Sequence, residues 1–436
     1  MAPVTTAGST HARHRVERGV LGNGLRVVFS PDRAAPVAGV AVAYDVGTRS
    51  ESPGRAGFAH LFEHLMFQGS VGLRRSAHAR CVERSGGSFS GSTHLDHTMY
   101  SEVAPANALE RLLYLESDRM RGLRLTEASL ANQISVVKEE IRTNVLSRPY
   151  AGFPWPRLAP VMFGSFANTH DGHGSFADLE AASLADAAEF FDRHYTSRNA
   201  VLSVCGDFDP DRVARHVERF FEDVPDRAAP ARVDLGEPEP EGGRACYRDP
   251  VAPLPAVAWG WRVPDPVGAL ADFLPHVLLA GLLAAADGGR LVRRLVVADR
   301  SATSVTARAG LLGDAFTLRD PSALVFQARM PAAGTADRVL AGAFQEMDVL
   351  ARRGPEAGEL AGVVAQAVAG LLGKTDSVLG RARRLAVFEL QRAAPELLGE
   401  LPALLAAVGP DRVRGAAAQL TPDRCVSIEL IPAAGA

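Results

Sequence analysis

Two hydrophobic periods alternate along the chain, one typical of β-strands and the other of amphipathic helices. Short apolar runs bounded by turn residues predict strands at 20–29, where Asn23-Gly24 is the turn of a hairpin, and at 37–44, 98–103, 199–206, 256–263, 302–309 and 322–330. The glycines within 86–93 suit an edge strand. Apolar residues three and four positions apart predict helices at 77–84, 106–120, 127–142, 184–195, 272–281, 336–352, 356–372 and 380–392. This mixture of periods predicts an α/β fold of the α+β type.

A stretch rich in Pro, Ala and acidic residues, 224–243, interrupts this pattern and is the best candidate for a linker. A strand followed by an apolar helix occurs on both sides of it, first within 37–66 and again within 256–281. We therefore predict a duplication, with two homologous domains at residues 1–228 and 238–436. Residues 1 to about 15 are expected to form a loose arm.

The composition is that of an ordinary globular protein. Of the 436 residues, 47% are hydrophobic and 22% are charged, and the formal net charge is −3. This balance gives no basic surface of the kind that nucleic-acid binding requires. No stretch of about 18 apolar residues occurs, so we expect no membrane-spanning helix. The length allows two or three domains, each with its own core.

The four cysteines are far apart in the sequence, and none belongs to a Cys-x-x-Cys pair; they are Cys81, Cys205, Cys246 and Cys425. This spacing favours buried thiols over a disulfide or zinc framework, and it fits a reducing compartment. The first residues contain no apolar core of a signal peptide. We therefore expect a cytoplasmic protein.

One short predicted helix, within residues 57–69, carries three titratable side chains on an otherwise apolar surface, which indicates a specific role for them. His60 and His64 are four residues apart, so their imidazoles lie on one helical face and can bind one metal ion, with Glu63 beside them. The remaining surface of this helix is apolar. The alternative interpretation is two hydrogen-bonded core histidines next to a surface glutamate.

Other candidate ligands follow in the chain. The helix at 127–142 presents Gln133 and Glu140 at the edge of its apolar face, and Glu139 is the alternative acid there. His94 and His97 stand near a strand, where we expect them to point to opposite faces and not to bind a metal.

With both helices placed, the sequence resembles the pitrilysin, insulinase and mitochondrial processing peptidase family, the inverted zincins with the motif H-x-x-E-H. Members of this family take a third zinc ligand from a Glu in a Val-Val-Lys-x-Glu context. Here residues 136–140 read Val-Val-Lys-Glu-Glu, and Glu140 follows His64 by 76 residues. The resemblance therefore implies Zn²⁺ bound by His60, His64 and Glu140.

The resemblance also implies an activity. Two imidazoles and one carboxylate leave an open position on zinc for water, and Glu63 would act as the general base of a zinc endopeptidase. It implies two homologous domains per chain, each a mainly antiparallel sheet packed with helices. It also implies two chains or linked halves that close like a clamshell around an unfolded peptide, with this chain as the zinc-bearing subunit. The peptide would add to an edge strand. We assign that strand to Ser88, Phe89, Ser90, Gly91, Ser92 and Thr93.

One departure from the family bears on assembly. Many relatives carry an Arg and a Tyr seven residues apart that reach the substrate; here the Arg is Arg381, a candidate catalytic residue, but the Tyr position is Phe388. We therefore expect a heterodimer whose homologous partner chain supplies Arg and Tyr, with a homodimer as the second choice. The rival functions are a non-catalytic scaffold subunit and a dedicated leader peptidase that matures a ribosomally made peptide.

Overall fold

A computed structural model describes residues 15–238, 241–285, 288–311 and 314–433. The predicted arm at residues 1–14 and Asp287 lie outside the described residues. The chain forms two compact units, and each unit is assembled from three segments. The first unit comprises Met1–Glu139, Asp171–Val233 and Leu371–Leu401, and the second comprises Glu140–His170, Asp234–Gly370 and Pro402–Ala436.

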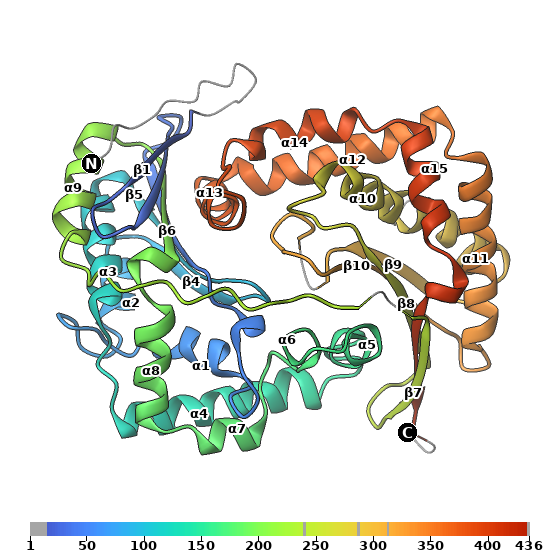
Figure 1. Ribbon diagram of the computed structural model, residues 1–436, viewed down its shortest axis with the longest axis horizontal. Helices are drawn as coiled ribbons and strands as arrows, with labels where there is room; N and C mark the ends of the chain where they lie inside the picture. Colours follow the sequence, from blue (N-terminus) through green and yellow to red (C-terminus); the bar gives the residue numbers. More distant parts are fainter. Residues whose placement is uncertain (1–14, 239–240, 286–287, 312–313, 434–436) are drawn as a thin grey trace. The chain divides into compact units, whose positions relative to one another are not determined.

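The first unit contains a six-stranded sheet in the order β1-β2-β6-β3-β5-β4 (Figure 1). Its strands are β1 (Glu17–Val20), β2 (Arg26–Pro31), β3 (Val37–Tyr44), β4 (Ser88–Thr93), β5 (Thr98–Pro105) and β6 (Ala200–Gly206). Only β2 and β6 pair in parallel; every other pair is antiparallel. β4 ends this order, which confirms the predicted edge strand.

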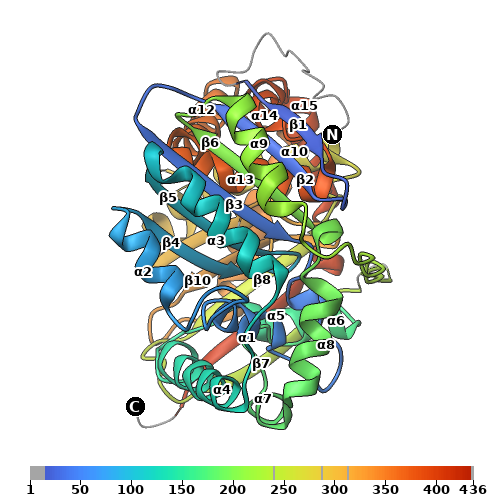
Figure 2. The same ribbon diagram turned by 90° about the vertical axis from the view of Figure 1, so that its left-hand side faces the viewer.

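Helices of the first unit cover both faces of its sheet. They are α1 (Phe58–Leu65), α2 (Ala77–Arg84), α3 (Leu109–Arg121), α4 (Glu127–Ile141), α7 (Phe176–Ala181), α8 (Leu184–His194), α9 (Pro210–Phe221) and α13 (Val378–Arg392). Figure 2 shows α2, α3 and α9 in front of the strands. α13 packs directly on β3, β5 and β6 although it comes from the second half of the sequence.

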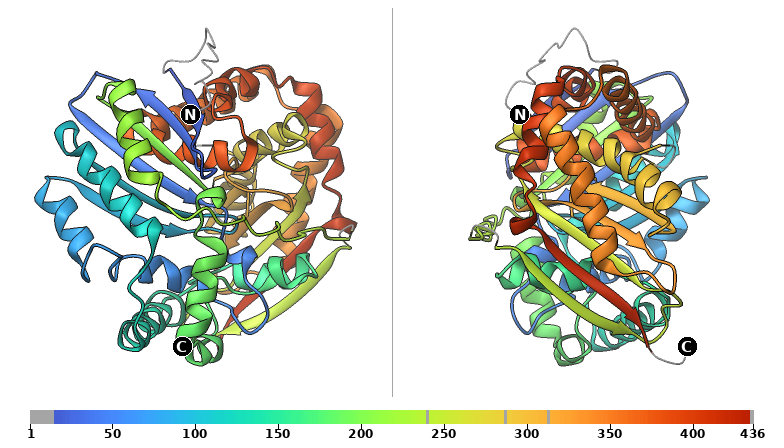
Figure 3. Two further views of the ribbon diagram at one scale, coloured as in Figure 1. Left: turned by 60° about the vertical axis from the view of Figure 1, so that its left-hand side comes forward. Right: turned by 90° about the vertical axis from the view of Figure 1, so that its right-hand side faces the viewer.

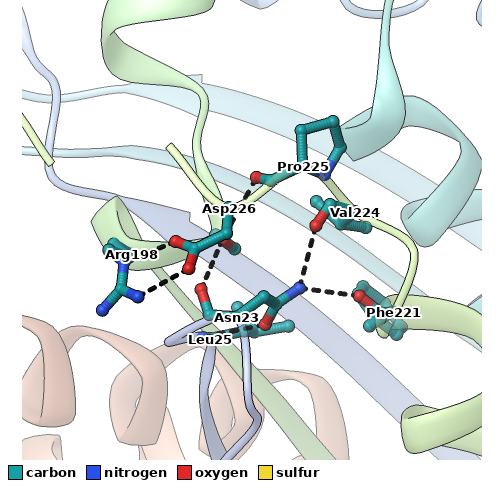
Figure 4. Close-up of polar contacts among 8 residues, drawn as sticks. Asn23, Leu25, Arg198, Phe221, Val224, Pro225 and Asp226 are labelled. Atoms are coloured by element: carbon teal, nitrogen blue, oxygen red, sulfur yellow. Dashed lines mark hydrogen bonds and ion pairs between the residues drawn. The ribbon is translucent and has the colours of Figure 1, made fainter. Parts of the chain in front are cut away.

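The hairpin predicted around Asn23-Gly24 is present, and it is fixed to the end of α9 (Figure 4). Gly24 has a φ of +82°, a conformation that glycine adopts without strain. Asn23 Nδ2 donates to the carbonyl oxygens of Phe221 (2.8 Å) and Val224 (3.1 Å). Phe221 is the last residue of α9 and Val224 lies three residues beyond it, so the side chain of one turn residue ties the hairpin to the segment that ends this helix.

The second unit has a five-stranded sheet in the order β7-β11-β8-β10-β9. The strands are β7 (Gly243–Asp249), β8 (Ala256–Val263), β9 (Ser304–Ala309), β10 (Ser322–Arg329) and β11 (Val426–Pro432). β7 and β11 run side by side in parallel in the right-hand view of Figure 3, and the other pairs are antiparallel. Two mainly antiparallel sheets with packed helices confirm the predicted fold class.

Most helices of the second unit come from the second half of the sequence. They are α5 (Trp155–Met162), α6 (Phe166–Thr169), α10 (Leu270–Ala284), α11 (Ala336–Arg353) and α15 (Pro410–Gln419), with π-helical turns at Arg142–Leu146 and Val292–Ala298. Two more, α12 (Ala357–Asp376) and α14 (Leu397–Ala406), span the division between the units. α5 packs on β7, β8 and β11, although it belongs to the first half of the sequence.

The two sheets share strand order and strand directions once β1 is left aside. Each has one parallel pair followed by antiparallel neighbours, so β2-β6-β3-β5-β4 corresponds to β7-β11-β8-β10-β9. The compact units nevertheless differ from two contiguous domains at 1–228 and 238–436, because α13 joins the first sheet and α5 the second. Homology of the two halves of the sequence stays a prediction.

Several elements were not anticipated, namely α5, α6, α7, α9, β7, α14, α15 and β11. The cysteines form no disulfide, as expected. The prediction of four buried thiols is wrong for Cys81, which is half-buried, and for Cys246, which is exposed on β7. Alternate residues of β7 face solvent, which explains its exposure. Within the described residues, no helix is both long and apolar enough to cross a membrane.

Candidate metal centre

Helix α1 buries its apolar face and leaves its polar residues accessible. Phe58, Leu61 and Phe62 are at most 1% exposed, and the ring of Phe62 stacks on that of Tyr195 with centroids 5.5 Å apart. The polar residues of the same helix are only half-buried; they are His60, Glu63 and His64. The apolar packing therefore fixes the helix and turns its polar stripe away from the core.

The first turn of α1 is held by a carboxylate from an earlier segment. Glu51 accepts hydrogen bonds from the backbone N–H groups of Gly57 (2.9 Å) and Ala59 (2.8 Å). These donors lack partners inside the helix, and a negative charge is favoured at a helix N-terminus. Glu51 thus fixes the start of the helix that carries both histidines.

Three predicted ligands meet at one place. One ligand atom each from His60, His64 and Glu140 lies within 4.8 Å of the others, and all three residues are half-buried. Glu140 is the penultimate residue of α4. The residues of α4 up to Glu139 belong to the first unit, and the helix continues unbroken from Glu139 to Glu140. Glu139 is exposed and does not belong to the group.

The donor set of this group suits zinc. Two imidazole nitrogens and one carboxylate oxygen are the ligands of catalytic zinc sites, in which a fourth position stays open. His60 Nδ1 donates to the carbonyl oxygen of His173 (3.3 Å), which leaves Nε2 as the nitrogen for a metal. The residues present therefore fit a zinc ion.

Glu63 lies against the edge strand that was predicted to bind substrate. The Thr93 hydroxyl donates to Glu63 Oε2 at 2.8 Å, and a Cβ atom built at Gly91 would lie 2.8 Å from Glu63 Cγ. All residues of β4 except Ser88 are half-buried. The strand and the candidate base are thus neighbours; peptide binding by β4 stays a prediction.

Comparisons with known proteins identify the family of this chain. Residues 26–149 match the family model described as Insulinase (Peptidase family M16), and residues 181–367 match the Peptidase M16 inactive domain. The chain belongs to the M16 peptidase family. This confirms the resemblance to the pitrilysin and insulinase family found in the sequence.

Individual relatives of this M16 chain include proteases and one subunit of a larger complex. Zinc protease PqqE of Helicobacter pylori is 31% identical over 278 residues, 60% of each chain. Cytochrome b-c1 complex subunit 1 of Bos taurus is 26% identical over 260 residues, 57% of this chain and 52% of the relative. The matches thus span only part of these relatives. The crystal structure of a Helicobacter pylori protease has the same fold, with a TM-score of 0.88, 24% identity and coverage of 97% of this chain and 100% of that chain.

Arg381 of the M16 chain occupies a buried position within the first unit. It lies on α13, is 3% exposed, and its guanidinium forms an ion pair with Asp32 at 2.7 Å. Phe388 lies about two turns further along the same helix and is fully buried. The guanidinium of Arg392 lies over its ring. The ion pair with Asp32, which directly follows β2, ties α13 to its sheet. A catalytic role of Arg381 stays a prediction.

The rings of His94 and His97 do not point to opposite faces, contrary to our expectation. They stack with centroids 4.4 Å apart, because residues 94–97 form the turn between β4 and β5 rather than strand. Neither belongs to a metal-binding group among the described residues. Burial, and then the charge of Arg383, lower the pKa of His94.

A second group of ligand-type residues is buried beside the sheet. His78, Glu102 and Glu116 converge, with His78 contacting Glu102 and Arg119 contacting Glu116. Burial raises the pKa of both carboxyl groups and lowers that of His78, so these groups tend towards their neutral forms. Arg119 already supplies a cation here, with its guanidinium 4.3 Å from the Tyr100 ring centroid. These contacts are typical of a buried polar network in the core.

Sequence reasoning missed the residues that position the site, namely Glu51, Thr93 as a partner of Glu63, and His173. Thr93 had been placed on the correct strand, and its period-two relation to Gly91 was a usable signal. Glu51 and His173 lie in irregular segments around α1, where no periodicity points to a contact.

Proposed function

We propose that this chain is a zinc metalloendopeptidase that cleaves unfolded peptides or leader segments. The observation that carries the proposal is the convergence of His60, His64 and Glu140, with Glu63 on the same helix as both histidines. The half-buried state of all four side chains leaves them reachable by a substrate. Relationship to a zinc protease of Helicobacter pylori supports it.

The residues divide into ligands and a base. His60, His64 and Glu140 would hold the ion, and what zinc supplies when bound is a polarised scissile carbonyl and a lowered pKa of water. Glu63 takes a proton from the attacking water and passes it to the leaving amine, a transfer for which a positioned carboxylate is suited. The edge of β4 binds the peptide backbone by strand addition.

Metal analysis of two neighbouring variants tests the ligand set. Glu140→Gln should bind far less than one zinc per chain while keeping the wild-type circular dichroism spectrum, because a carboxylate ligand is lost from a surface that is only half-buried. Glu139→Gln is the matched control and should bind as much zinc as the wild type. Equal loss in both variants, or in neither, would contradict the assignment.

Turnover tests the base. Glu63→Gln should keep its zinc and lose at least about a hundredfold in kcat on an unfolded peptide. A zinc-loaded Glu63→Gln protein that cleaves at nearly the wild-type rate would place the base elsewhere.

The rival function is that of a scaffold subunit without activity. It is favoured by the relationship to a protein named as a subunit of the cytochrome b-c1 complex. The rival predicts no peptide cleavage by the zinc-loaded chain under any condition. Intact His60, Glu63, His64 and Glu140 in this sequence favour the enzyme.

We further propose that the working enzyme is a heterodimer with a homologous chain. The proposal rests on Phe388, which stands where related peptidases carry a Tyr and offers no hydroxyl to a developing oxyanion. The test compares the chain alone, the chain with Phe388→Tyr and the chain mixed with a homologue encoded beside it. Full activity of the lone chain, unchanged by Phe388→Tyr and by mixing with the homologue, would contradict a heterodimer.

A further inference from the structure

The carboxylate of Glu63 is held by a side chain from the edge strand. Thr93 Oγ1 lies 2.8 Å from Glu63 Oε2, and its contact with the carbonyl oxygen of Ala59 is longer, at 3.4 Å. A hydroxyl has one hydrogen to donate, so the shorter and charged acceptor takes it. The bond joins α1 to β4 across 30 positions of sequence.

A second residue of the same strand gives Glu63 its space. A Cβ atom at Gly91 would lie 2.8 Å from Glu63 Cγ and 3.2 Å from Oε1, closer than side chains tolerate. Gly91 and Thr93 are two residues apart, so they face the same side of the sheet. One therefore leaves room for the carboxylate and the other fixes one of its oxygens.

This arrangement determines which carboxylate oxygen of Glu63 can take part in proton transfer. The hydrogen bond from Thr93 engages Oε2, and among the described residues no hydrogen bond engages Oε1. A carboxylate held at one oxygen keeps a fixed direction at the other, which reduces the rotamer freedom that a half-exposed Glu otherwise has. Proton transfer at Oε1 then needs no reorientation of the side chain.

We infer that Thr93 is a positioning residue for Glu63, which it holds through Oε2 so that Oε1 faces the reacting water. The inference rests on the proposed peptidase function. β4 pairs only with β5 within the described strands, so its other edge can accept a peptide. One strand thereby aligns the base through its side chains and the substrate through its backbone.

The test replaces the hydroxyl without changing the shape of the side chain. In the full chain loaded with zinc, Thr93→Val should lower kcat on an unfolded peptide by about tenfold to a hundredfold, as expected for loss of a hydrogen bond to a charged group. KM and zinc content should stay within about twofold, and Thr93→Ser should recover most of the rate. Thr93→Ala should repeat the loss if the β-branched Val disturbs folding.

A matched control and a double variant separate positioning from structure. Thr306→Val makes the same change at an exposed position of β9, the edge strand of the other sheet, and should leave kcat unchanged. In a Glu63→Gln background, Thr93→Val should change the residual rate by less than about twofold, because its effect passes through Glu63.

The outcomes distinguish this inference from the function it rests on. If Glu63→Gln abolishes zinc-dependent cleavage but both Thr93→Val and Thr93→Ala keep the wild-type kcat, the inference is wrong and the peptidase stands. Loss of zinc, or equal losses in the presence and absence of Glu63, would show a structural role instead. A wild-type chain that shows no zinc-dependent cleavage, either alone or mixed with the homologous chain, would overturn both.

Discussion

Removal of the Glu51 carboxylate should loosen the helix that carries His60 and His64, the two histidines of the candidate zinc site. Glu51 is 5% exposed and accepts from the N–H groups of Gly57 and Ala59 at the start of α1. In Glu51→Ala both donors lose their acceptor, and the helix N-terminus loses a compensating negative charge. The first turn of α1 itself contains no acidic residue that could replace this charge.

The magnitude follows from the two bonds and the charge. A capping hydrogen bond contributes about 1 kcal/mol, and a charge near the helix terminus about 0.3–1 kcal/mol. Two bonds and the charge together give roughly 3 kcal/mol, equivalent to about a hundredfold change in the opening equilibrium of α1. Glu51→Gln keeps one acceptor oxygen and should lose about half as much.

Native-state hydrogen exchange measured by mass spectrometry on the metal-free protein reads this opening directly. Peptides covering α1 should exchange about a hundredfold faster in Glu51→Ala, while peptides covering α10 in the second unit should be unchanged. Glu189→Ala is the control, because its surface ion pair with Arg55 contributes little. A change in α1 below about threefold, or an equal change in α10, would refute the capping role.

Two further predictions concern Gly91 and His194. Gly91→Val should keep zinc but lose at least about tenfold in kcat, because its Cβ would already crowd Glu63 Cγ; an unchanged kcat would show that Glu63 adapts. Burial, and then the charge of Arg193, lower the pKa of His194 to about 4, against the opposing effect of Glu189. Because the folded imidazole binds its proton at lower pH than the unfolded one, stability is lost as pH falls from 6.5 towards 4, by up to about 3 kcal/mol. Urea unfolding of the metal-free protein should show this loss in the wild type and less of it in His194→Gln; equal loss in both would contradict the shift.

Elements with a clear period could be predicted from the sequence with their bounds. β3 and β8 match the predicted ranges to the residue, as does α2, and β4 begins two residues inside the predicted range of 86–93. These segments are bounded by Gly, Pro or polar turns, and their apolar residues pack against a neighbour on a known face. The candidate ligands His60 and His64 could also be predicted, because two residues four apart on one helix lie on the same face.

Packing between distant segments could not be predicted in the same way. α13 covers the first sheet and α5 the second, yet the apolar face of either helix would fit any apolar sheet. The parallel pairing of β11 with β7 likewise joins residues nearly two hundred positions apart through backbone groups, which leave no mark in the side-chain pattern. Tertiary pairing, and not local preference, decides these contacts.

Arg381 shows the limit of transferring a role by motif position. Its place in the sequence matches the position of a substrate-binding Arg in related peptidases, but in this chain its buried guanidinium is held by Asp32 at 2.7 Å. Removal of one partner of a buried ion pair leaves the other charge uncompensated, which costs several kcal/mol. A loss of activity in Arg381→Ala would therefore arise from loosening of α13 even if the residue never touched a substrate. Because a guanidinium has five N–H donors, the ion pair with Asp32 and a contact with substrate are compatible, so only a contact with bound peptide, and not the loss of activity alone, can assign that role.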